Sequence, residues 1–267
     1  MAIVDTAPAQ REKADTRLIV KDLGKTYVTG KDAHEIFRGV ELDVEPGSIV
    51  SVVGPSGVGK TTLLRCLAGL LPATTGTISV GGRMVTGPVP EMGVVFQDYS
   101  RSLLPWMHSR ENVALPLESK GVRKAERNRI AEEALAAVGL EGAGHKYPWQ
   151  MSGGMQQRVA IARAIAYQAD ILLMDEPFAS VDAQTRFDLE DLALDLRRRL
   201  GVSIVLVTHD IDEAVYLADQ VVVLSGKPAS VVDLVEVDLG TERDQLTTKS
   251  LPAFTEARSR VLRQIRR

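Results

Sequence analysis

The sequence contains little cysteine, few aromatic residues and no long apolar run. One of its 267 residues is cysteine, and 4% are Phe, Trp or Tyr. A lone cysteine excludes an internal disulfide and a zinc site made of several cysteines, and the apolar neighbours of Cys66 in TLLRCLAGL indicate a small core residue. The apolar runs are also far shorter than the roughly 18 to 20 residues that cross a bilayer. We therefore expect neither a disulfide scaffold nor a membrane-spanning segment.

Charge of one sign is not in excess either. The 32 Lys and Arg nearly balance the 35 Asp and Glu, which gives a formal net charge of −3. Such a chain lacks the overall basic field that holds nucleic-acid phosphates, so no nucleic-acid partner is expected. With 45% hydrophobic and 25% charged residues, the composition is that of a globular domain. Residues 1–17 lack the apolar core of a secretory signal, and we interpret them as a disordered tail on a cytoplasmic protein.

Segments typical of strands alternate along the chain with segments typical of helices, which favours a parallel sheet with crossover helices. Residues 49–53, 171–174 and 203–207 are apolar without alternation, as in strands that are covered on both faces. Further strands are expected at residues 18–21, 40–44, 77–80, 93–96 and 220–224. The sequence thus predicts an α/β fold.

A helical insert is predicted at residues 98 to about 165 of this sheet domain. Within it, Ile130, Ala134 and Val138 recur at the spacing of one helical face. Gly139 directly follows and is placed as a C-terminal stop, because glycine adopts the left-handed conformation that ends many helices.

Residues 241–267 are predicted to form a C-terminal extension with an amphipathic helix. Phe254, Ala257, Val261 and Ile265 fall on one helical face, while arginines occupy much of the rest. Two interpretations are open at this point. The helix docks on the core of its own domain and leaves its arginines in solvent, or it binds a membrane surface.

The strongest motif is GPSGVGKT at residues 54–61, which fits the phosphate-loop pattern G-x-x-x-x-G-K-[ST]. It stands between an apolar strand and a helical run, as this loop requires. Its glycines let backbone N–H groups converge on phosphates, Lys60 reaches the β and γ phosphates, and the Thr61 hydroxyl can bind Mg²⁺. The predicted nucleotide-binding residues of this segment are Gly54, Pro55, Ser56, Gly57, Val58, Gly59, Lys60, Thr61 and Thr62.

An acidic pair ends the apolar run in ILLMDEP. We expect Asp175 to bind Mg²⁺ and Glu176 to act as the base for the attacking water, since nucleotide hydrolysis needs both functions. Alternation along a strand would point the two side chains in different directions. Such a pair is by itself often a helix cap or a turn, so this assignment depends on the phosphate loop.

A second anion site is predicted in MSGGMQQR at residues 151–158. Ser152 is a candidate N-cap, and the backbone of Gly153 and Gly154 at a helix N-terminus can bind phosphate. A plain helix cap would give the same pattern if it stood alone.

Together these residues resemble the ATP-binding cassette (ABC) ATPase family. The resemblance covers about residues 18–225 and rests on the order phosphate loop, Gln97, SGGMQQ, ILLMDE, SVD at residues 180–182, and His209. It implies a P-loop NTPase domain at residues 18–240, with a RecA-like parallel-sheet core, an N-terminal antiparallel β subdomain and a helical insert. It also implies that the chain hydrolyses ATP with Mg²⁺.

The resemblance further implies roles for single residues. Tyr27 would stack on adenine, although a strand-edge tyrosine packed on the core would look the same in sequence. Gln97 would contact Mg²⁺ and the attacking water, His209 would contact the γ-phosphate, and Asp182 would link the two sites of a dimer. In this family the SGG loop completes the ATP site of the opposing subunit. The residues assigned in this way are Ser152, Gly153, Gly154 and Gln156.

A finer similarity points to importer ATPases for nitrate, sulfonates, taurine and related solutes, through DYSRSLLPWMHSRENVALPLE and FTEARSRVLRQIR. It implies a homodimer bound to two permease subunits at the cytoplasmic face of the cell membrane, served indirectly by an extracytoplasmic solute-binding protein. Residues 103–106 would lie by the groove that receives a permease helix, or Leu104 and Trp106 would be core residues of the insert. The alternative function is a soluble ABC ATPase in assembly or nucleic-acid processing.

Overall fold

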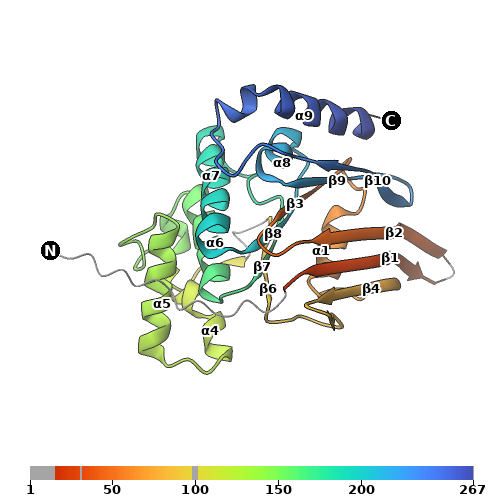
Figure 1. The fold of residues 1–267 in the computed structure, drawn as a ribbon. Helices are drawn as coiled ribbons and strands as arrows, with labels where there is room; N and C mark the ends of the chain where they lie inside the picture. The colour runs from red at the N-terminus through yellow and green to blue at the C-terminus, as the bar shows by residue number, and fades with distance from the viewer. Residues whose placement is uncertain (1–15, 31, 98–101, 267) are drawn as a thin grey trace.

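The computed structural model describes residues 16–30, 32–97 and 102–266. One sheet of ten strands runs through these residues, in the order β5-β4-β1-β2-β10-β9-β3-β8-β7-β6 (Figure 1). The predicted tail, residues 1–17, lies outside the described residues apart from its last two. Of these, Arg17 pairs with Asp43 and with Glu45, at the end of the neighbouring strand and directly after it. The assignment of residues 1–17, 18–240 and 241–267 as separate units stays a prediction.

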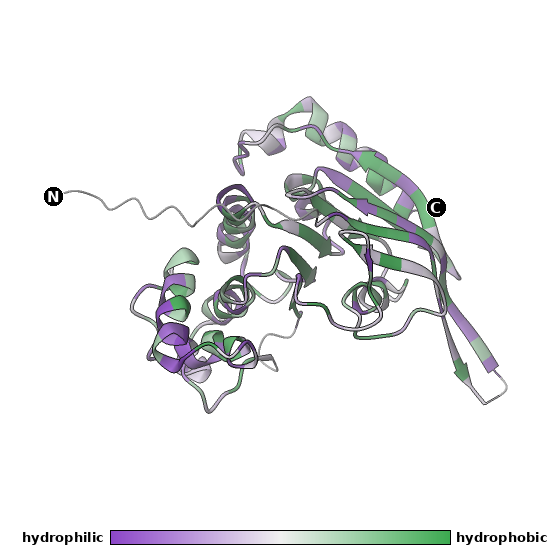
Figure 2. Cartoon of the chain, turned by 60° about the horizontal axis from the view of Figure 1, so that its bottom comes forward, coloured by the Kyte–Doolittle hydropathy of each residue, from purple (hydrophilic) through white to green (hydrophobic). Residues whose placement is uncertain are grey.

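The predicted parallel core is confirmed. Its strands are, in spatial order, β9 (Gln220–Gly226), β3 (Ile49–Val53), β8 (Ser203–Val207), β7 (Ile171–Asp175) and β6 (Met92–Val95). Each pairs in parallel with its neighbours in this list. Every residue of β3, β7 and β8 is buried, and Figure 2 colours these strands largely as hydrophobic. Their unbroken apolar runs are explained by cover on both faces.

The predicted N-terminal antiparallel strands are also present. They are β1 (Leu18–Thr29), β2 (Asp32–Val44), β4 (Thr75–Val80) and the short β5 (Arg83–Met84). β10 (Ala229–Glu236) pairs antiparallel with β9 and touches β2 in parallel, so the antiparallel strands and the parallel core form one sheet. The sequence did not predict β5 and β10, and it predicted β1 and β2 as much shorter strands.

Helices cover the two faces of the parallel core (Figure 1). On one face, α1 (Lys60–Leu67) packs in a cluster with Val52 and Leu173. On the other face, a second cluster joins Ile49 and Met174 to helices. These helices are α6 (Gly153–Ala166), α7 (Ala183–Leu200), α8 (Ile211–Leu217) and α9 (Pro252–Ile265). The sheet therefore separates α1 from α6.

The insert contains α3 (Ser109–Ala114), α4 (Pro116–Ser119), α5 (Lys124–Ala137) and a 3-10 turn, η1 (Pro148–Gln150). α3, α5 and α6 pack together. Ala134 and Val138 are buried, Ile130 packs beside them, and Gly139 has a left-handed φ of 74° that ends the turn. The helical face and its stop are thus confirmed, while the boundaries 98–165 stay a prediction. Trp106 is 70% exposed, so its interpretation as a core residue is wrong.

The C-terminal helix α9 follows a 3-10 turn, η2 (Thr248–Ser250). Phe254, Ala257 and Val261 are buried, and α9 packs on α8, β9 and β10. Arg260 pairs with Asp233 of β10. Docking on the chain's own core is therefore confirmed.

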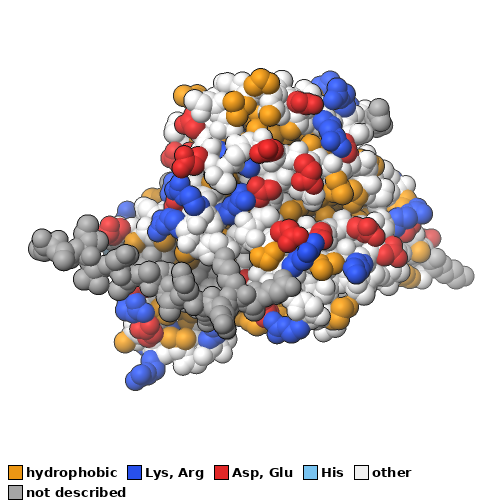
Figure 3. Space-filling model, viewed as in Figure 1, with side chains coloured by type: hydrophobic (Ala, Val, Ile, Leu, Met, Phe, Trp, Pro, Cys, Tyr) orange, Lys and Arg blue, Asp and Glu red, His pale blue; other side chains and the backbone are white. Residues whose placement is uncertain are grey.

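Two surface properties bear on possible partners. On the face shown in Figure 3, basic and acidic side chains are interspersed, in keeping with the small net charge. Among the residues that the structure describes, no helix combines the length and the apolar character needed to cross a membrane.

Candidate active site

The phosphate-loop sequence forms a tight connection between β3 and α1. A Cβ on Gly54 would lie 2.4 Å from the carbonyl oxygen of Leu224 on β9, so only glycine fits there. Gly59 has a φ of 108°, in the region that favours glycine, and a Cβ on it would lie 2.6 Å from Cγ2 of Ile36 on β2. The loop is thereby held against both parts of the sheet, with the N-terminus of α1 at its end.

Lys60, the first residue of α1, is buried within this loop. Its Nζ donates to the carbonyl oxygens of Gly54 at 2.8 Å and Pro55 at 3.2 Å. Burial lowers the pKa of Lys60, while the nearby charges of Glu176 and Asp175 act in the opposite direction. The ammonium therefore lies next to the loop backbone and in the field of both predicted catalytic carboxylates.

Thr61 and Asp175 meet beside Lys60. The Thr61 hydroxyl donates to Asp175 Oδ1 at 3.0 Å, and Asp175 is the buried last residue of β7. Burial raises the pKa of Asp175, and the hydrogen bond from Thr61 opposes that rise. Hydroxyl and carboxylate oxygens suit Mg²⁺, which is commonly held by one or two carboxylates together with substrate phosphates. Thr61 and Asp175 supply one such hydroxyl and one such carboxylate.

Glu176 turns out of the strand by a left-handed residue. β7 ends at Asp175, and Glu176 has a φ of 42°, an uncommon conformation for a residue with a side chain. Its N–H donates to the carbonyl oxygen of Val207 on β8 at 2.7 Å. The sequence predicted that strand alternation points the two carboxylates in different directions. This reason is wrong, because Glu176 lies beyond the end of β7. The two carboxylates have different partners: Asp175 accepts from Thr61, whereas Glu176 contacts Gln97 and His209.

Three of the predicted residues come together at the carboxyl ends of adjacent parallel strands. Glu176 Oε2 accepts a hydrogen bond from Gln97 Nε2 at 3.1 Å and lies 3.0 Å from His209 Nδ1. Gln97 follows β6, Glu176 follows β7 and His209 follows β8. Ligands of open α/β sheets bind beyond this edge. The carboxylate is thus oriented by an amide and an imidazole at the edge where the phosphate loop also lies.

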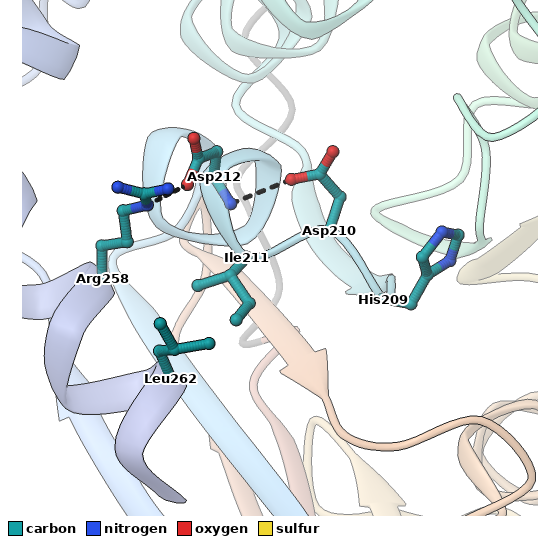
Figure 4. A pocket seen from close by; sticks show the side chains of 6 residues that line it. All are labelled: His209, Asp210, Ile211, Asp212, Arg258 and Leu262. Atoms are coloured by element: carbon teal, nitrogen blue, oxygen red, sulfur yellow. Dashed lines mark hydrogen bonds and ion pairs between the residues drawn. The ribbon is translucent and has the colours of Figure 1, made fainter. Parts of the chain in front are cut away.

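His209 also borders an open depression of about 390 Å³ between α8 and α9. Figure 4 shows the six residues that line it: His209, Asp210, Ile211, Asp212, Arg258 and Leu262. Across it, Arg258 of α9 pairs with Asp212 of α8 at 2.5 Å. Asp210 caps α8 by accepting from the N–H groups of Asp212 and Glu213. The segment that carries His209 is thereby fixed to α8, and α8 is tied to α9.

The SGG segment begins α6, as predicted. Ser152 Oγ accepts from the Met155 N–H at 3.3 Å, so Ser152 is the N-cap. Gly154 is buried against α7, where a Cβ on it would lie 2.3 Å from Thr185 Cγ2. Asp182 caps α7 and accepts from the N–H and the hydroxyl of the same Thr185, at 3.0 and 2.7 Å. The SGG segment and Asp182 are therefore neighbours through one threonine.

These residues do not meet the phosphate loop of their own chain. α6 and α1 pack on opposite faces of the parallel core (Figure 1). Gln156 Nε2 donates to the Met151 carbonyl oxygen, within its own segment. Within the described ranges, no hydrogen bond or ion pair joins residues 152–156 to residues 54–62. The two predicted anion sites of one chain thus remain apart.

Tyr27 lies on β1 with 42% of its surface exposed. An exposed ring does not fit a residue packed on the core. The Nζ of Lys25 lies 5.0 Å from the centre of the ring. The sequence did not single out Lys25, because a lysine in a half-exposed strand gives no signal of its own.

Two further polar residues near the site were also missed. Arg163 of α6 donates to the carbonyl oxygen and the hydroxyl of Ser102, close behind Gln97 in the chain. Glu213 of α8 is buried, and burial together with the charges of Glu190 and Asp210 raises its pKa to about 8. Arg163 is the single charge of the apolar run VAIARAIAYQ, and Glu213 stands beside Asp212 at the start of α8. From sequence alone, both are expected at the surface.

A phosphate loop, a hydroxyl–carboxylate pair suited to Mg²⁺ and an oriented glutamate at the same sheet edge define a P-loop nucleotide hydrolase. The family described as ABC transporter matches residues 37–179. The chain belongs to this family and is an ATPase, as the sequence predicted.

Individual relatives agree with this assignment. An uncharacterized ABC transporter ATP-binding protein of Methanocaldococcus jannaschii is 42% identical over 258 residues, which cover 97% of this chain and 94% of that protein. The taurine import ATP-binding protein TauB of Escherichia coli is 42% identical over 230 residues, covering 85% and 89%. A solved dimeric structure of the ATP-binding cassette MJ0796 bound to ADP and Pi superposes with a TM-score of 0.73 at 32% identity, covering 83% of this chain and 99% of that one.

Proposed function

We propose that this chain is the ATP-hydrolysing subunit of an ABC importer and that it closes as a homodimer around two ATP molecules. The observation that carries this proposal is the Glu176 carboxylate, held by Gln97 and His209 at the edge where Thr61 and Asp175 meet. This arrangement supplies metal ligands, a base and a means of orienting it.

Residues 54–62 bind the triphosphate in this proposal. Lys60 exchanges its loop carbonyl partners for phosphate oxygens, which form stronger charge-assisted contacts with an ammonium. Thr61, Asp175 and Gln97 would hold Mg²⁺, which would neutralise charge that develops on the phosphates. The N-terminus of α1 adds its positive dipole end.

Glu176 accepts the proton of the attacking water. Both of its contacts fall on Oε2, and among the described residues Oε1 has no hydrogen-bond partner, so we assign the water to Oε1. Gln97 and His209 hold the carboxylate in place. With both ring nitrogens protonated, His209 can donate from Nδ1 to Oε2 and from Nε2 to the γ-phosphate.

A second copy of the chain completes each site. One chain holds its SGG segment and its phosphate loop on opposite faces of the sheet, so they cannot bind the same nucleotide. In the dimer, Ser152, Gly153 and Gly154 of one copy contact the ATP of the other, and Asp182, joined to Gly154 through Thr185, links the two sites. The dimeric state of the ADP-bound relative supports this arrangement.

The dimer is proposed to act at the cytoplasmic face of the cell membrane, bound to two permease subunits. Residues 103–106 lie by the groove that receives a permease helix, with Leu103 buried in the core of the chain. The exposed Trp106 supports this role because an aromatic ring in solvent is suited to a protein interface. Similarity to a taurine import protein supports taurine, a sulfonate, nitrate or a related small solute as the cargo, delivered by a solute-binding protein.

Co-purification tests the importer role. A tagged chain co-expressed with a candidate permease should remain with it in detergent, and Trp106→Ala should reduce its recovery. Leu246→Ala is the matched control, because Leu246 is also an exposed apolar residue but lies in the C-terminal extension. Equal recovery of both variants would remove residues 103–106 from the interface. A chain that never binds the permease would favour a soluble assembly factor.

A further inference from the structure

Lys25 is a buried cation for which the described part of the chain offers no carboxylate partner. It is 8% exposed, and its Nζ donates to the carbonyl oxygen of Pro72 at 2.7 Å. Within residues 16–30, 32–97 and 102–266, Lys25 forms no ion pair with an acidic side chain. Burying a charge in this way is costly unless its surroundings compensate for it. The burial of this charge therefore indicates that the Lys25 ammonium has a specific role.

The second neighbour of the Lys25 ammonium is the ring of Tyr27. The distance of 5.0 Å from Nζ to the ring centre is within the range of a cation–π contact. Tyr27 itself is exposed and has part of its ring surface free for a ligand. A cation thus supports the aromatic side chain to which we assign adenine.

The hydrogen bond to Pro72 ties this contact to the phosphate-binding part of the molecule. Pro72 lies in the segment between α1, which follows the phosphate loop, and β4. Two adjacent hydrogen bonds join the same segment to β1: Thr74 N–H donates to the Gly24 carbonyl oxygen at 2.8 Å, and Thr26 N–H donates to Thr74 Oγ1 at 2.9 Å. Lys25 therefore connects the strand that carries Tyr27 with the segment that follows the phosphate-loop helix.

We propose that Lys25 is a positioning residue for the base half of the nucleotide site. Anchored on Pro72, its ammonium holds the Tyr27 ring at a fixed place relative to the phosphate loop, so that adenine stacks on a preorganised surface. Preorganisation favours binding because less side-chain freedom is lost when the ligand arrives. This inference rests on the proposed adenine-stacking role of Tyr27.

The test separates base binding from phosphate binding. Lys25→Met keeps an unbranched side chain, one heavy atom shorter, but removes the charge and the donor. The exposed Lys21→Met on the same strand is the control. The variant should raise the KM for ATP by about 3- to 10-fold with kcat within about 2-fold, as the range of cation–π strengths suggests. The affinity for inorganic tripolyphosphate, which has no base, should stay at the parent value.

A double-mutant comparison tests whether Lys25 affects ATP binding through Tyr27. Tyr27→Leu alone should weaken ATP binding, and adding Lys25→Met to it should cause no further loss, since residues that act through one contact are not additive. Lys25→Gln, which keeps a polar donor but not the charge, should fold as the parent does and show the same loss of ATP affinity. It keeps the test valid if the methionine variant fails to fold.

The outcomes distinguish a failure of the stacking role of Tyr27 from a failure of the role proposed for Lys25. If Tyr27→Leu leaves ATP affinity unchanged, the stacking role fails and the inference fails with it. If Tyr27→Leu weakens ATP binding but Lys25→Gln and Lys25→Met do not, only the inference about Lys25 is overturned. An equal loss of tripolyphosphate affinity would also overturn it, because the effect would then lie on the phosphate side.

Discussion

Glu176 and His209 face each other across the carboxyl ends of β7 and β8, with 3.0 Å between Glu176 Oε2 and His209 Nδ1. Glu176 has a left-handed φ of 42° directly after the end of β7. A residue in that conformation is held by its surroundings at some energetic cost, as is common at functional sites. The pair therefore provides the most specific evidence for the chemistry of this chain.

Glu176→Gln should bind Mg-ATP but hydrolyse it about 10² to 10⁴ times more slowly, the range by which a general base accelerates a reaction. The amide keeps the size of the side chain but cannot accept the proton of water. Phosphate release under saturating ATP measures the slower hydrolysis, and nucleotide affinity measures the retained binding. Glu141→Gln, an exposed carboxylate of the insert, should behave as the parent does. Parent turnover in Glu176→Gln would exclude Glu176 as the base.

Lys60→Ala should lose ATP binding as well as hydrolysis. The lysine supplies a charge-assisted contact to phosphate that alanine cannot replace, and its removal also vacates the buried space beside Gly54. Titration with a fluorescent ATP analogue should show affinity reduced by at least about 10-fold, given the 1.5 to 3 kcal/mol typical of hydrogen bonds to charged groups. Lys124→Ala, on the exposed start of α5, serves as the control. Unaltered affinity in Lys60→Ala would refute the phosphate-loop assignment.

Glu213→Gln should stabilise the fold at alkaline pH. Burial first, then the charges of Glu190 and Asp210, raise the pKa of Glu213 from 4.5 to about 8 in the folded chain, while Thr208 and Arg186 act against the rise. Because the folded state binds a proton that the unfolded state releases, the free energy of unfolding falls as the pH rises from about 4.5 to about 8. Glutamine releases no proton, so this loss of stability disappears. Its amide oxygen can still accept a hydrogen bond from Thr208.

Thermal unfolding at pH 5 and pH 8 measures this effect. One pKa unit corresponds to about 1.4 kcal/mol, so the gain of Glu213→Gln at pH 8 should exceed its gain at pH 5 by more than that. The exposed Glu242→Gln should show no such difference. Equal effects of Glu213→Gln at both pH values would mean that Glu213 is ionised in the folded chain at pH 8 and pH 5 alike.

Much of the candidate site could be predicted from sequence because its residues follow apolar strands directly. Gln97, Glu176 and His209 each stand one or two residues beyond a buried parallel strand, and parallel strands end at one edge of the sheet. The position of these residues directly after the strands thus predicts that they lie close together in the fold. The parallel core was predictable for the same reason, since strands covered on both faces have unbroken apolar runs.

Other features depend on tertiary contacts that leave little trace in sequence. The left-handed turn at Glu176 is held by a hydrogen bond to Val207 on another strand. The length of β1 beyond residue 21 comes from pairing with β2, although many of its outer residues are exposed. Trp106 was open to two interpretations because an aromatic residue in a helical insert fits a core or an interface equally well, and only its exposure decides against the core.

The central claim is that each ATP is held between the phosphate loop of one copy and the SGG segment of the other. Its consequence is complementation between two inactive chains. A mixed dimer of Lys60→Ala and Ser152→Arg places both lesions in one site and leaves the other site intact, whereas sites built within one chain would each keep a lesion. The separation of α1 and α6 by the sheet is the structural basis for this expectation.

The most direct measurement is phosphate release in a single turnover by the mixed variants, compared with each variant alone at the same total concentration. Single-turnover conditions require only that one intact site hydrolyse its ATP once. The account predicts that the mixture is active while Lys60→Ala and Ser152→Arg are each inactive. A mixture as inactive as its two components would contradict the shared sites and, with them, the proposed ATP-closed homodimer.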